Sequence, residues 1–304
     1  MTPPKLSIVI VSFNTRPDLE RCLESLTGSP PAIPHEIVVV DNASTDGSAD
    51  AVRRRWPAVR VVAQGRNAGF AAANNTGIRA SSGTLLLLLN SDCVVPGGAI
   101  DRLVERLSAH PDAAVAGPRL VDATGRTELS FGRMISPWAE LRQKALGIAC
   151  NRGLGPAVRW LDRAVSSEKY VDWVSGAVLL VYRADAEAAG LLDERYFLYT
   201  EDVDFCAAIR ARGRRVLFTP EATVTHLRGR SRATVPGGMN AAYRRSHLAF
   251  YEKHHPYWAP LLRIYLGLRG QLPRAWSHQR RSGGDEANGS QKRRNGGNGG
   301  IGEE

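Results

Sequence analysis

Residues 84–92 read TLLLLLNSD, a run of five leucines that leads into three polar residues. An apolar run without alternation predicts a strand that is buried on both faces of its sheet. Shorter apolar runs at residues 6–11, 36–40 and 59–63 predict three further strands. Helical patterns separate these runs, at residues 15–26, 46–55, 70–80 and 96–109. The alternation predicts an α/β fold with a mostly parallel central sheet and helices on both faces.

In sheets of this kind, ligands bind beyond the carboxyl ends of the strands. That rule places four polar segments on one rim of the sheet: residues 12–14, 41–44, 67–69 and 90–92. Asp41 ends an apolar run and can accept a hydrogen bond from a ribose hydroxyl or a base N–H. Asp, Asn, Ser and Thr are also the usual residues of turns, so this motif alone leaves both interpretations open.

Residues 65–78 read GRNAGFAAANNTGI and contain unusually small side chains. Small residues let a backbone approach either a phosphate or a neighbouring helix closely, and both explanations fit the pattern. Asn74 is the best candidate for a polar contact with a ligand, because alanines line the rest of this predicted helix.

Asp92 lies just beyond the buried leucine strand. A carboxylate in such a place is costly to desolvate unless it is paired or bound to a cation. Carboxylate oxygens suit Mg²⁺ or Mn²⁺, which can bridge a diphosphate and offset the charge of a leaving nucleotide. Capping of the helix at 96–109 is the alternative, but Asp92 is several residues upstream of it.

A second acidic site occupies residues 199–210, YTEDVDFCAAIR. Glu201, Asp202 and Asp204 stand at the start of a helical pattern, where acids are favoured by the helix dipole. Three acids within four residues exceed what capping needs, so one of them is predicted to be a general base. A metal site and a base together are what group transfer from a phosphate ester to a hydroxyl requires.

The pattern weakens after residue 115, and Gly and Pro within residues 142–163 predict an irregular or mobile stretch. Residues 171–182 form a long strand-like run that is broken by Gly176. A strand is predicted at 215–219, His226 follows in a Gly- and Arg-rich turn, and residues 240–254 predict a helix.

The C-terminal part of the chain divides into two segments. Residues 257–268 are amphipathic and begin with aromatic side chains, which predicts either an interfacial membrane helix or a helix packed on the domain or a second subunit. After about residue 278 the sequence is Gly-rich and charged and cannot build a core, so it is predicted to be disordered.

The chain has 304 residues and a net charge of +10, which favours anionic partners. Nucleic acid is not expected, because no groove-reading or base-stacking motif accompanies the charge. The four cysteines are widely spaced and predict reduced thiols. We expect no signal peptide or membrane span, and therefore a cytoplasmic protein, with a peripheral contact on the inner face of the plasma membrane if residues 257–268 bind lipid.

Seven segments of the chain together resemble family 2 glycosyltransferases, in particular the branch of rhamnosyltransferases and related cell-envelope enzymes. They occur in the family's order and span about residues 5–255: VSFN (11–14), VVVDNASTDGS (38–48), GRNAGFAAANN (65–75), LLLNSD (87–92), DWVSGAVLLV (172–181), YFLYTEDVDFCAAIRARG (196–213) and THLRGRS (225–231). The resemblance implies a GT-A fold, a nucleoside-diphosphate sugar donor, a divalent cation (Mg²⁺ or Mn²⁺) and inversion at the anomeric centre.

The resemblance also implies roles for single residues. It gives the nucleotide-sugar pocket to Ser12, Asn14, Asp41, Asn67, Asn74, Asn90 and Ser91. Asp92 takes the metal position of the DxD motif, in which Asn90 replaces the first acid. His226 matches a metal or diphosphate contact, Trp173 and Gly176 wall the sugar and acceptor pocket, and Asp202 is the catalytic base with Glu201 as the fallback.

These implications divide the chain into a GT-A domain at 1–255, an amphipathic and possible membrane-associating segment at 256–277, and a disordered basic tail at 278–304. The expected activity is transfer of a sugar, with rhamnose as the first guess, to a saccharide or polyprenyl-linked acceptor in cell-envelope polysaccharide synthesis. Two alternatives are an inactive nucleotide-sugar-binding protein and a sugar-phosphate nucleotidyltransferase, although the latter lacks its Gly-rich basic loop after the first strand. Whether the chain forms a homo-oligomer is left open.

Overall fold

The computed structural model describes residues 5–227 and 236–273. The elements follow in chain order: β1 Leu6–Ser12, α1 Arg16–Gly28, β2 His35–Asp41, α2 Ser48–Arg55, β3 Arg60–Ala63, α3 Phe70–Arg79, β4 Leu85–Asn90, β5 Cys93–Val94, α4 Ala99–Ser108, β6 Ala113–Val121, β7 Thr127–Glu128, β8 Phe131–Gly132, α5 Pro137–Asn151, α6 Gly155–Ala164, β9 Lys169–Val171, β10 Trp173–Val174, β11 Val178–Tyr182, α7 Arg183–Ala188, α8 Glu201–Ala211, β12 Arg215–His226, α10 Pro236–His254 and α11 Ala259–Leu268.

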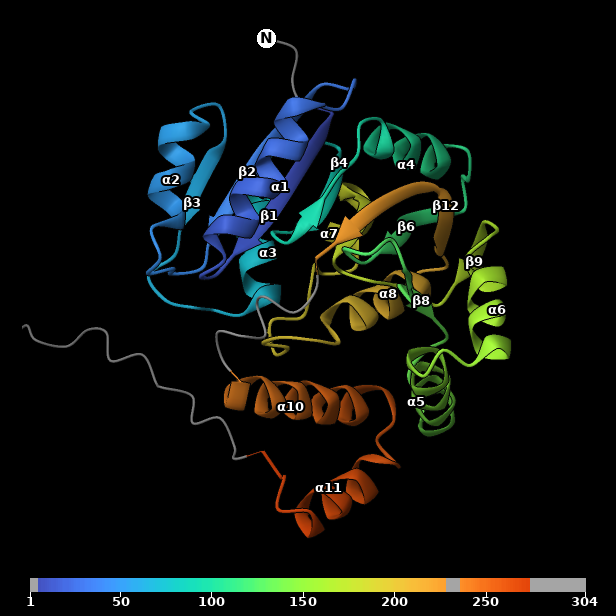
Figure 1. The fold of residues 1–304 in the computed structure, drawn as a ribbon. Helices are drawn as coiled ribbons and strands as arrows, with labels where there is room; N and C mark the ends of the chain where they lie inside the picture. Colours follow the sequence, from blue (N-terminus) through green and yellow to red (C-terminus); the bar gives the residue numbers. More distant parts are fainter. Residues whose placement is uncertain (1–4, 228–235, 274–304) are drawn as a thin grey trace, which may run out of the picture. The chain divides into compact units, whose positions relative to one another are not determined.

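A ten-stranded mixed sheet forms the centre of the molecule (Figure 1). Its main path runs β3-β2-β1-β4-β11-β6-β12-β5, with β7 paired to β6 and β9 paired to β12. The first four strands are parallel, as the sequence predicts, while β11 runs antiparallel to both β4 and β6. The carboxyl ends of β1, β2 and β4 therefore meet on one rim, and β11 enters the sheet from that same rim.

Helices cover both faces of this sheet, because alternate residues of each buried strand point to opposite sides. Leu85, Leu87 and Leu89 of β4 pack with residues of α1, α2 and α4 in one apolar cluster. Leu86 and Leu88 pack with residues of α3, α7, α8, α10 and α11 in the other. The prediction of an α/β sheet covered on both faces is confirmed.

The stretch at 142–163 is helical, so the prediction of an irregular segment is wrong. Helix α5 begins after Ser136, whose side chain accepts a hydrogen bond from Ala139 N–H at 3.3 Å, and Pro137 occupies the first turn. Helix α6 likewise has a proline in its first turn. Proline at a helix start costs no hydrogen bond, since the first N–H groups have no partner inside the helix.

Two strand predictions also need correction. Residues 171–182 form parts of three separate strands, β9, β10 and β11, and the short strand β10 pairs with β8 in a second sheet. Strand β12 is longer than predicted and continues past an irregularity between Thr219 and Thr223. His226 consequently ends a strand paired with β5, where it lies opposite Cys93, and is not in a turn.

Helices α10 and α11 follow β12 along the chain and cover the α8 side of the sheet. Phe250 and Tyr251 of α10 and Ala259 of α11 are buried in the cluster that contains α8. Among the described residues, no helix is both long enough and apolar enough to span a bilayer. All four cysteines are free thiols, as predicted. The predicted tail at 278–304 lies outside the described residues.

Candidate active site

A buried chain of hydroxyl groups joins the loop after β1 to the loop after β4. Ser12 Oγ lies 3.1 Å from Thr15 Oγ1, which in turn lies 2.9 Å from Ser91 Oγ. Thr15 is at the N-cap position of α1 but makes no capping hydrogen bond, because its hydroxyl is used in this chain. The three side chains fix the position of Asp92, and the predicted contacts of Ser12 and Ser91 with a nucleotide sugar stay predictions.

The loops after β1 and β2 are tied together by Asn14. Its backbone has a positive φ of 53°, a conformation that Asn adopts more readily than most residues. Its side-chain Oδ1 accepts a hydrogen bond from Thr45 N–H at 2.8 Å, and its own N–H donates to Ser44 Oγ at 3.0 Å. Asn14 therefore shapes the rim where the sequence places the nucleotide.

Asp41 lies at the end of β2 with one carboxylate oxygen unused. Oδ2 accepts a hydrogen bond from Ser44 N–H at 3.2 Å, which is the turn contact expected of an Asp in this motif. Oδ1 is buried and has no hydrogen-bond partner among the described residues. A buried carboxylate oxygen without a donor is costly, so this atom is ready to receive an N–H or O–H group of a ligand.

The backbone at the start of α3 lies in close contact with the backbone of Phe197. Asn67 Oδ1 accepts hydrogen bonds from Asn42 Nδ2 at 2.8 Å and from Gly69 N–H at 3.0 Å, which holds the turn. Phe70 N–H donates to Phe197 O at 2.7 Å, and a Cβ on Gly69 would lie only 2.5 Å from that oxygen. At Gly69 the small residue therefore permits the approach of the 197–200 loop, which leads into α8.

Asn74 is fully buried on α3, and its Nδ2 donates to Phe70 O at 3.0 Å. Its Oδ1 has no hydrogen-bond partner among the described residues. Its predicted contact with the nucleotide sugar stays a prediction, as does that of Asn67.

Asp92 and His226 come together beside the rim. His226 Nε2 lies 3.3 Å from Asp92 Oδ1, and Leu227 N–H donates to Asp92 O at 2.9 Å. The other ring nitrogen of His226, Nδ1, lies 3.2 Å from Glu128 Oε2 on β7. All three side chains are buried. A histidine held by a carboxylate through its second nitrogen is the usual arrangement behind a metal-binding imidazole.

The donor atoms of this cluster suit a hard divalent cation. Ligand atoms of Asp92, Cys93 and His226 lie within 4.8 Å of one another. Burial raises the pKa of the Cys93 thiol well above its usual range, and Sγ donates to Ala177 O at 3.5 Å. Cys93 is therefore a protonated core residue, which leaves one carboxylate oxygen and one imidazole nitrogen as candidate ligands.

His226 should make the stability of the metal-free protein depend on pH. Burial alone would lower its pKa, but hydrogen bonds with Asp92 and Glu128 outweigh burial and raise the pKa to about 9 from 6.5. The folded state thus holds this proton more tightly than the unfolded chain, and the resulting stabilisation is complete below about pH 6.5 and lost as the pH rises through about 9. Urea unfolding of chelator-treated protein across this window should show a falling free energy of unfolding.

The variant His226→Gln, which has no titrating group, is the control for this prediction and should flatten most of the decline. An equal decline in wild type and variant would mean that another group carries the proton.

Asp202 is fixed at the start of α8 by two backbone amides. Gly176 N–H donates to Oδ2 and Val203 N–H donates to Oδ1, both at 2.8 Å. A Cβ on Gly176 would lie 3.1 Å from Asp202 Cβ, so glycine permits this contact. Burial raises the pKa of Asp202 against the opposing effect of the two amides, while part of the residue stays exposed to solvent. A positioned carboxylate with a raised pKa is well suited to accept a proton near neutral pH.

The two neighbouring acids differ from Asp202. Burial and the charge of Asp202 raise the pKa of Glu201 well above its usual range, and its Oε2 has no partner among the described residues. Asp204 faces α10, where Lys253 Nζ lies 2.8 Å from Oδ2 and His254 Nε2 lies 2.6 Å from Oδ1. Burial alone would raise the pKa of Asp204, but His254 and Lys253 lower it. Asp204 thus joins α8 to α10.

A short backbone segment links the two acidic sites that the sequence predicts. Gly176, which binds Asp202, is followed by Ala177, whose carbonyl accepts hydrogen bonds from Asn90 N–H at 2.9 Å and from Cys93 Sγ. The loop that carries Asp92 therefore adjoins the residue that holds Asp202. The segments that hold the two acids are therefore adjacent where β4 ends and β11 begins, and their joint action in one reaction stays a prediction.

Trp173 lies mostly in the core. Its side chain is buried in an apolar cluster, and its Nε1 donates to Arg133 O at 2.8 Å. Its predicted contact with the sugar stays a prediction. Arg228, Arg230 and Ser231 of the THLRGRS segment lie outside the described residues.

Two contacts of the site were not predicted from the sequence: that of Glu128 with His226, and that of the Thr15 hydroxyl with Ser91. Glu128 lies on a two-residue strand 98 positions away from His226, and no local pattern marks it. Thr15 begins the helical pattern at 15–26, where threonine commonly caps the helix, so its sequence position does not indicate the contact with Ser91.

Comparisons with known proteins identify the family and the fold. Residues 7–158 match the model of the family described as glycosyl transferase family 2. A curated relative, N-acetylglucosaminyl-diphospho-decaprenol L-rhamnosyltransferase of Mycobacterium tuberculosis, is 33% identical over 284 residues, which cover 88% of this chain and 92% of the relative.

Two solved structures share the fold. One is GalNAc-T7 with UDP, GalNAc and Mn²⁺, at a TM-score of 0.55 and 18% identity over 74% of this chain and 43% of that one. The other is the mannosyltransferase PcManGT from Pyrobaculum calidifontis with GDP-Man and Mn²⁺, at a TM-score of 0.57 and 20% identity over 88% of this chain and 70% of that one. The fold is therefore the GT-A fold of glycosyltransferases, and the chain belongs to glycosyl transferase family 2.

Proposed function

We propose that this glycosyltransferase moves a sugar, with rhamnose as the first candidate, from a nucleoside-diphosphate sugar to a hydroxyl group of a lipid-linked saccharide, with inversion. The Mycobacterium tuberculosis relative is an N-acetylglucosaminyl-diphospho-decaprenol L-rhamnosyltransferase, and it aligns with most of this chain. The observation that carries the proposal is the placement of Asp202, held by Gly176 beside the loop of Asp92.

The nucleotide is proposed to lie along the ends of β1 and β2. The unpartnered Oδ1 of Asp41 would accept a hydrogen bond from the base or ribose. Asn14 shapes the neighbouring loop, and the buried Ser12–Thr15–Ser91 chain keeps the two loops at a fixed separation. A pocket that is organised before binding loses less conformational entropy when the donor arrives.

Asp92 and His226 are proposed to hold a divalent cation, Mg²⁺ or Mn²⁺, with Glu128 orienting the imidazole. Such a cation supplies positive charge that offsets the charge of the leaving diphosphate. Both structural neighbours contain Mn²⁺, which supports Mn²⁺ as the first ion to test.

Asp202 is proposed to accept the proton of the acceptor hydroxyl as that oxygen attacks C1 of the sugar. The oxygen forms the new glycosidic bond while the C1–O bond to the diphosphate breaks on the opposite face, which inverts the anomeric centre. Gly176 and Val203 keep the carboxylate oriented throughout, because each amide binds one of its oxygens.

A lipid-linked acceptor would require the enzyme to reach a membrane surface. We propose that residues 256–277, which include α11, make this peripheral contact on the cytoplasmic side. Tyr257, Leu261, Ile264 and Leu268 are exposed, as an interfacial helix needs.

A thermal-shift screen tests the donor proposal. The full chain is heated with dTDP-rhamnose, UDP-glucose or GDP-mannose, each with and without Mn²⁺ or Mg²⁺. A donor present at about 100 times its Kd stabilises the fold by about 2.7 kcal/mol, which raises the Tm by about 5 °C for a chain of this size.

We expect the largest shift with dTDP-rhamnose and Mn²⁺, and we expect Asp92→Asn to lose the metal-dependent part of it. A folded protein whose Tm responds to none of the nucleotide sugars would contradict the proposed function.

A further inference from the structure

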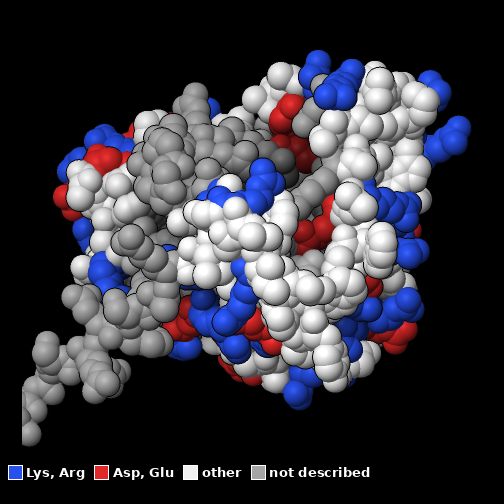
Figure 2. Space-filling view, turned by 90° about the horizontal axis from the view of Figure 1, so that it is seen from below, with Lys and Arg blue, Asp and Glu red and all other residues white. Residues whose placement is uncertain are grey.

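Exposed apolar side chains gather in one part of the molecule. In the described part of the chain, the large apolar residues that remain exposed all lie within 138–160 or 243–272: Trp138, Leu141, Ile148, Leu154, Trp160, Tyr243, Tyr257, Trp258, Leu261, Ile264, Tyr265, Leu268 and Leu272. These belong mainly to α5, α6 and α11. Figure 2 views the molecule from below Figure 1 and shows a largely uncharged surface with Lys and Arg side chains around it. Large apolar side chains that remain exposed in such number mark a contact surface.

A groove with a volume of about 570 Å³ lies between α5, α10 and α11. Trp258, Leu261, Leu262 and Tyr265 form its α11 side, and Tyr243 belongs to its α10 side. The volume is in the range of sites that bind small organic ligands, which are usually lined by apolar and aromatic side chains.

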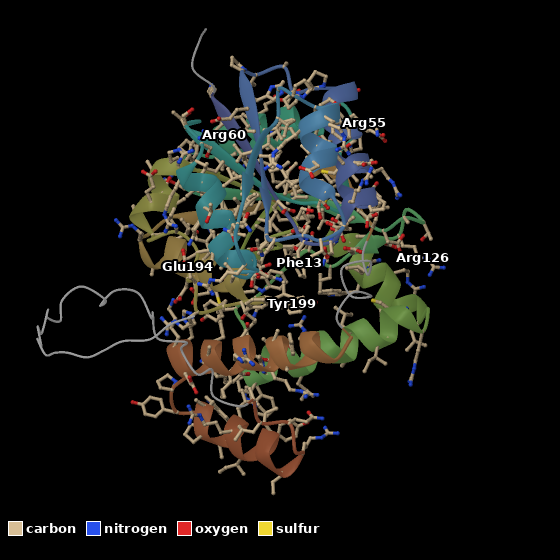
Figure 3. All side chains as sticks on the ribbon, turned by 90° about the vertical axis from the view of Figure 1, so that its left-hand side faces the viewer. Phe13, Arg55, Arg60, Arg126, Glu194 and Tyr199 are labelled. Carbon is tan, nitrogen blue, oxygen red and sulfur yellow. The ribbon has the colours of Figure 1, made fainter. Side chains whose placement is uncertain are left out.

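A row of rings connects this groove to the loop before the proposed base. The rings of Tyr199 and Tyr243 meet edge to face at 5.8 Å, and Tyr243 stacks on His247 at 5.6 Å. His247 meets Tyr251 at 4.9 Å farther along α10. Tyr199 lies between the sheet and α10 (Figure 3), three residues before Asp202 in the chain. The groove therefore begins beside the loop that positions Asp202.

The polar groups of the groove favour an anionic group at one end. Glu140 is already bound: its Oε1 accepts a hydrogen bond from Tyr251 Oη at 2.9 Å and lies 2.6 Å from His247 Nε2. Arg244 lines the groove next to Tyr243 and has neither a hydrogen bond nor an ion pair with any described residue. An unpaired guanidinium is a good partner for phosphate oxygens.

From these contacts we infer that the groove between α5, α10 and α11 binds the isoprenoid chain of the lipid-linked acceptor, with Arg244 facing its diphosphate. The inference rests on the proposed function and adds the site of the lipid. A groove can enclose a single lipid chain, whereas contact with a bilayer needs only an exposed apolar surface. The exposed apolar side chains of α5, among them Trp138 and Leu141, would shield the part of the chain that leaves the groove from water.

Fluorescence anisotropy of dansyl-labelled farnesyl diphosphate with the full chain tests this inference without any sugar transfer. The test variant is Leu261→Glu, which places a charge in the groove. The matched control is Ile264→Glu on the same helix: the two side chains are 57% and 60% exposed, but Ile264 does not line the groove. Because both are exposed, neither change should disturb folding, which Tm measurements check.

We expect Leu261→Glu to weaken probe binding by about tenfold or more, since it removes apolar contact and buries a charge. Ile264→Glu should bind the probe like the wild type, and excess inorganic diphosphate should not displace the probe. Equal losses in the two variants, no loss in either, or displacement by inorganic diphosphate would each overturn the inference.

Two further outcomes would assign the groove to another occupant and overturn the inference as well. One is binding to phosphatidylglycerol vesicles without any binding of the probe, which would indicate a bilayer contact alone. The other is a dimer that Leu261→Glu dissociates while the probe does not bind, which would indicate a subunit interface. Donor binding by the wild-type chain is measured separately by thermal shift, so failure of the proposed function is distinguishable from failure of this inference.

Discussion

Replacing Asp202 with asparagine is expected to lower kcat for sugar transfer by about 10²–10⁴-fold, the usual contribution of a positioned general base. Asparagine has nearly the same shape, but its amide cannot accept the proton of the acceptor hydroxyl. Binding of the donor should change little, because Asp202 lies on the acceptor side of the proposed site. Steady-state kinetics with the donor that the thermal-shift screen identifies would measure kcat, and the Tm would show whether the fold is retained.

Glu201→Gln is the companion to this experiment. Burial raises the pKa of Glu201 well above its usual range, which favours the protonated form that glutamine resembles. We expect this variant to keep far more activity than Asp202→Asn. The reverse order of activities would make Glu201 the base, and the assignment of Asp202 would then be wrong.

Gly69→Ala is expected to destabilise the protein by about 2–4 kcal/mol, from backbone strain and a steric clash together. Gly69 has a φ of +89°, and a new Cβ would lie 2.5 Å from Phe197 O and 2.9 Å from Phe197 Cα. Both contacts are with backbone, so a side-chain rotation cannot relieve them. Displacement of the 197–200 loop should also reduce activity, since this loop leads directly to Asp202. Urea unfolding would measure the change in the free energy of unfolding.

The variant Gly190→Ala separates the cost of backbone strain from the cost of the steric clash. Gly190 also has a φ of +89°, but a Cβ there would meet nothing within 4 Å. This variant should lose only about 1 kcal/mol, from backbone strain alone. If both variants lost the same amount, the contact with Phe197 would contribute nothing, and the explanation of the glycine at this position would fail.

The positions of the strands could be predicted from the sequence where an apolar run ends at polar residues. The run predicted at 6–11 became β1 at Leu6–Ser12, and the run predicted at 84–89 became β4 at Leu85–Asn90. These strands are buried on both faces, so their sequences carry the signal without help from distant residues. Strand β12 was predicted only to residue 219, because Pro220 breaks the pattern before the strand resumes.

Helices α5 and α6 could not be predicted from a buried apolar stripe, because several of their large apolar residues face solvent. Trp138 is 75% exposed, and Leu141, Ile148 and Trp160 are also exposed. In α5 the apolar residues show little helical periodicity toward a core. The serine and proline at the start of α5 were the available local signal, and they do mark its first turn.

The candidate site was only partly predictable, for a related reason. Asp92 and Asp202 follow recognisable local patterns, an apolar strand and an acidic helix start. Glu128 and the pairing of Gly176 with Asp202 depend on contacts between segments that are distant in the chain. Such contacts follow from tertiary packing, which a single sequence does not show.

A crystal structure of the protein with dTDP and Mn²⁺, with anomalous data collected at the manganese edge, tests the central arrangement most directly. We predict a manganese peak bound by Asp92 and His226, with the nucleotide along the ends of β1 and β2 and the Asp202 carboxylate facing the open side of the diphosphate. A manganese ion bound elsewhere, or a diphosphate on the side of the sheet away from Asp202, would contradict the proposal that these two acids serve one reaction.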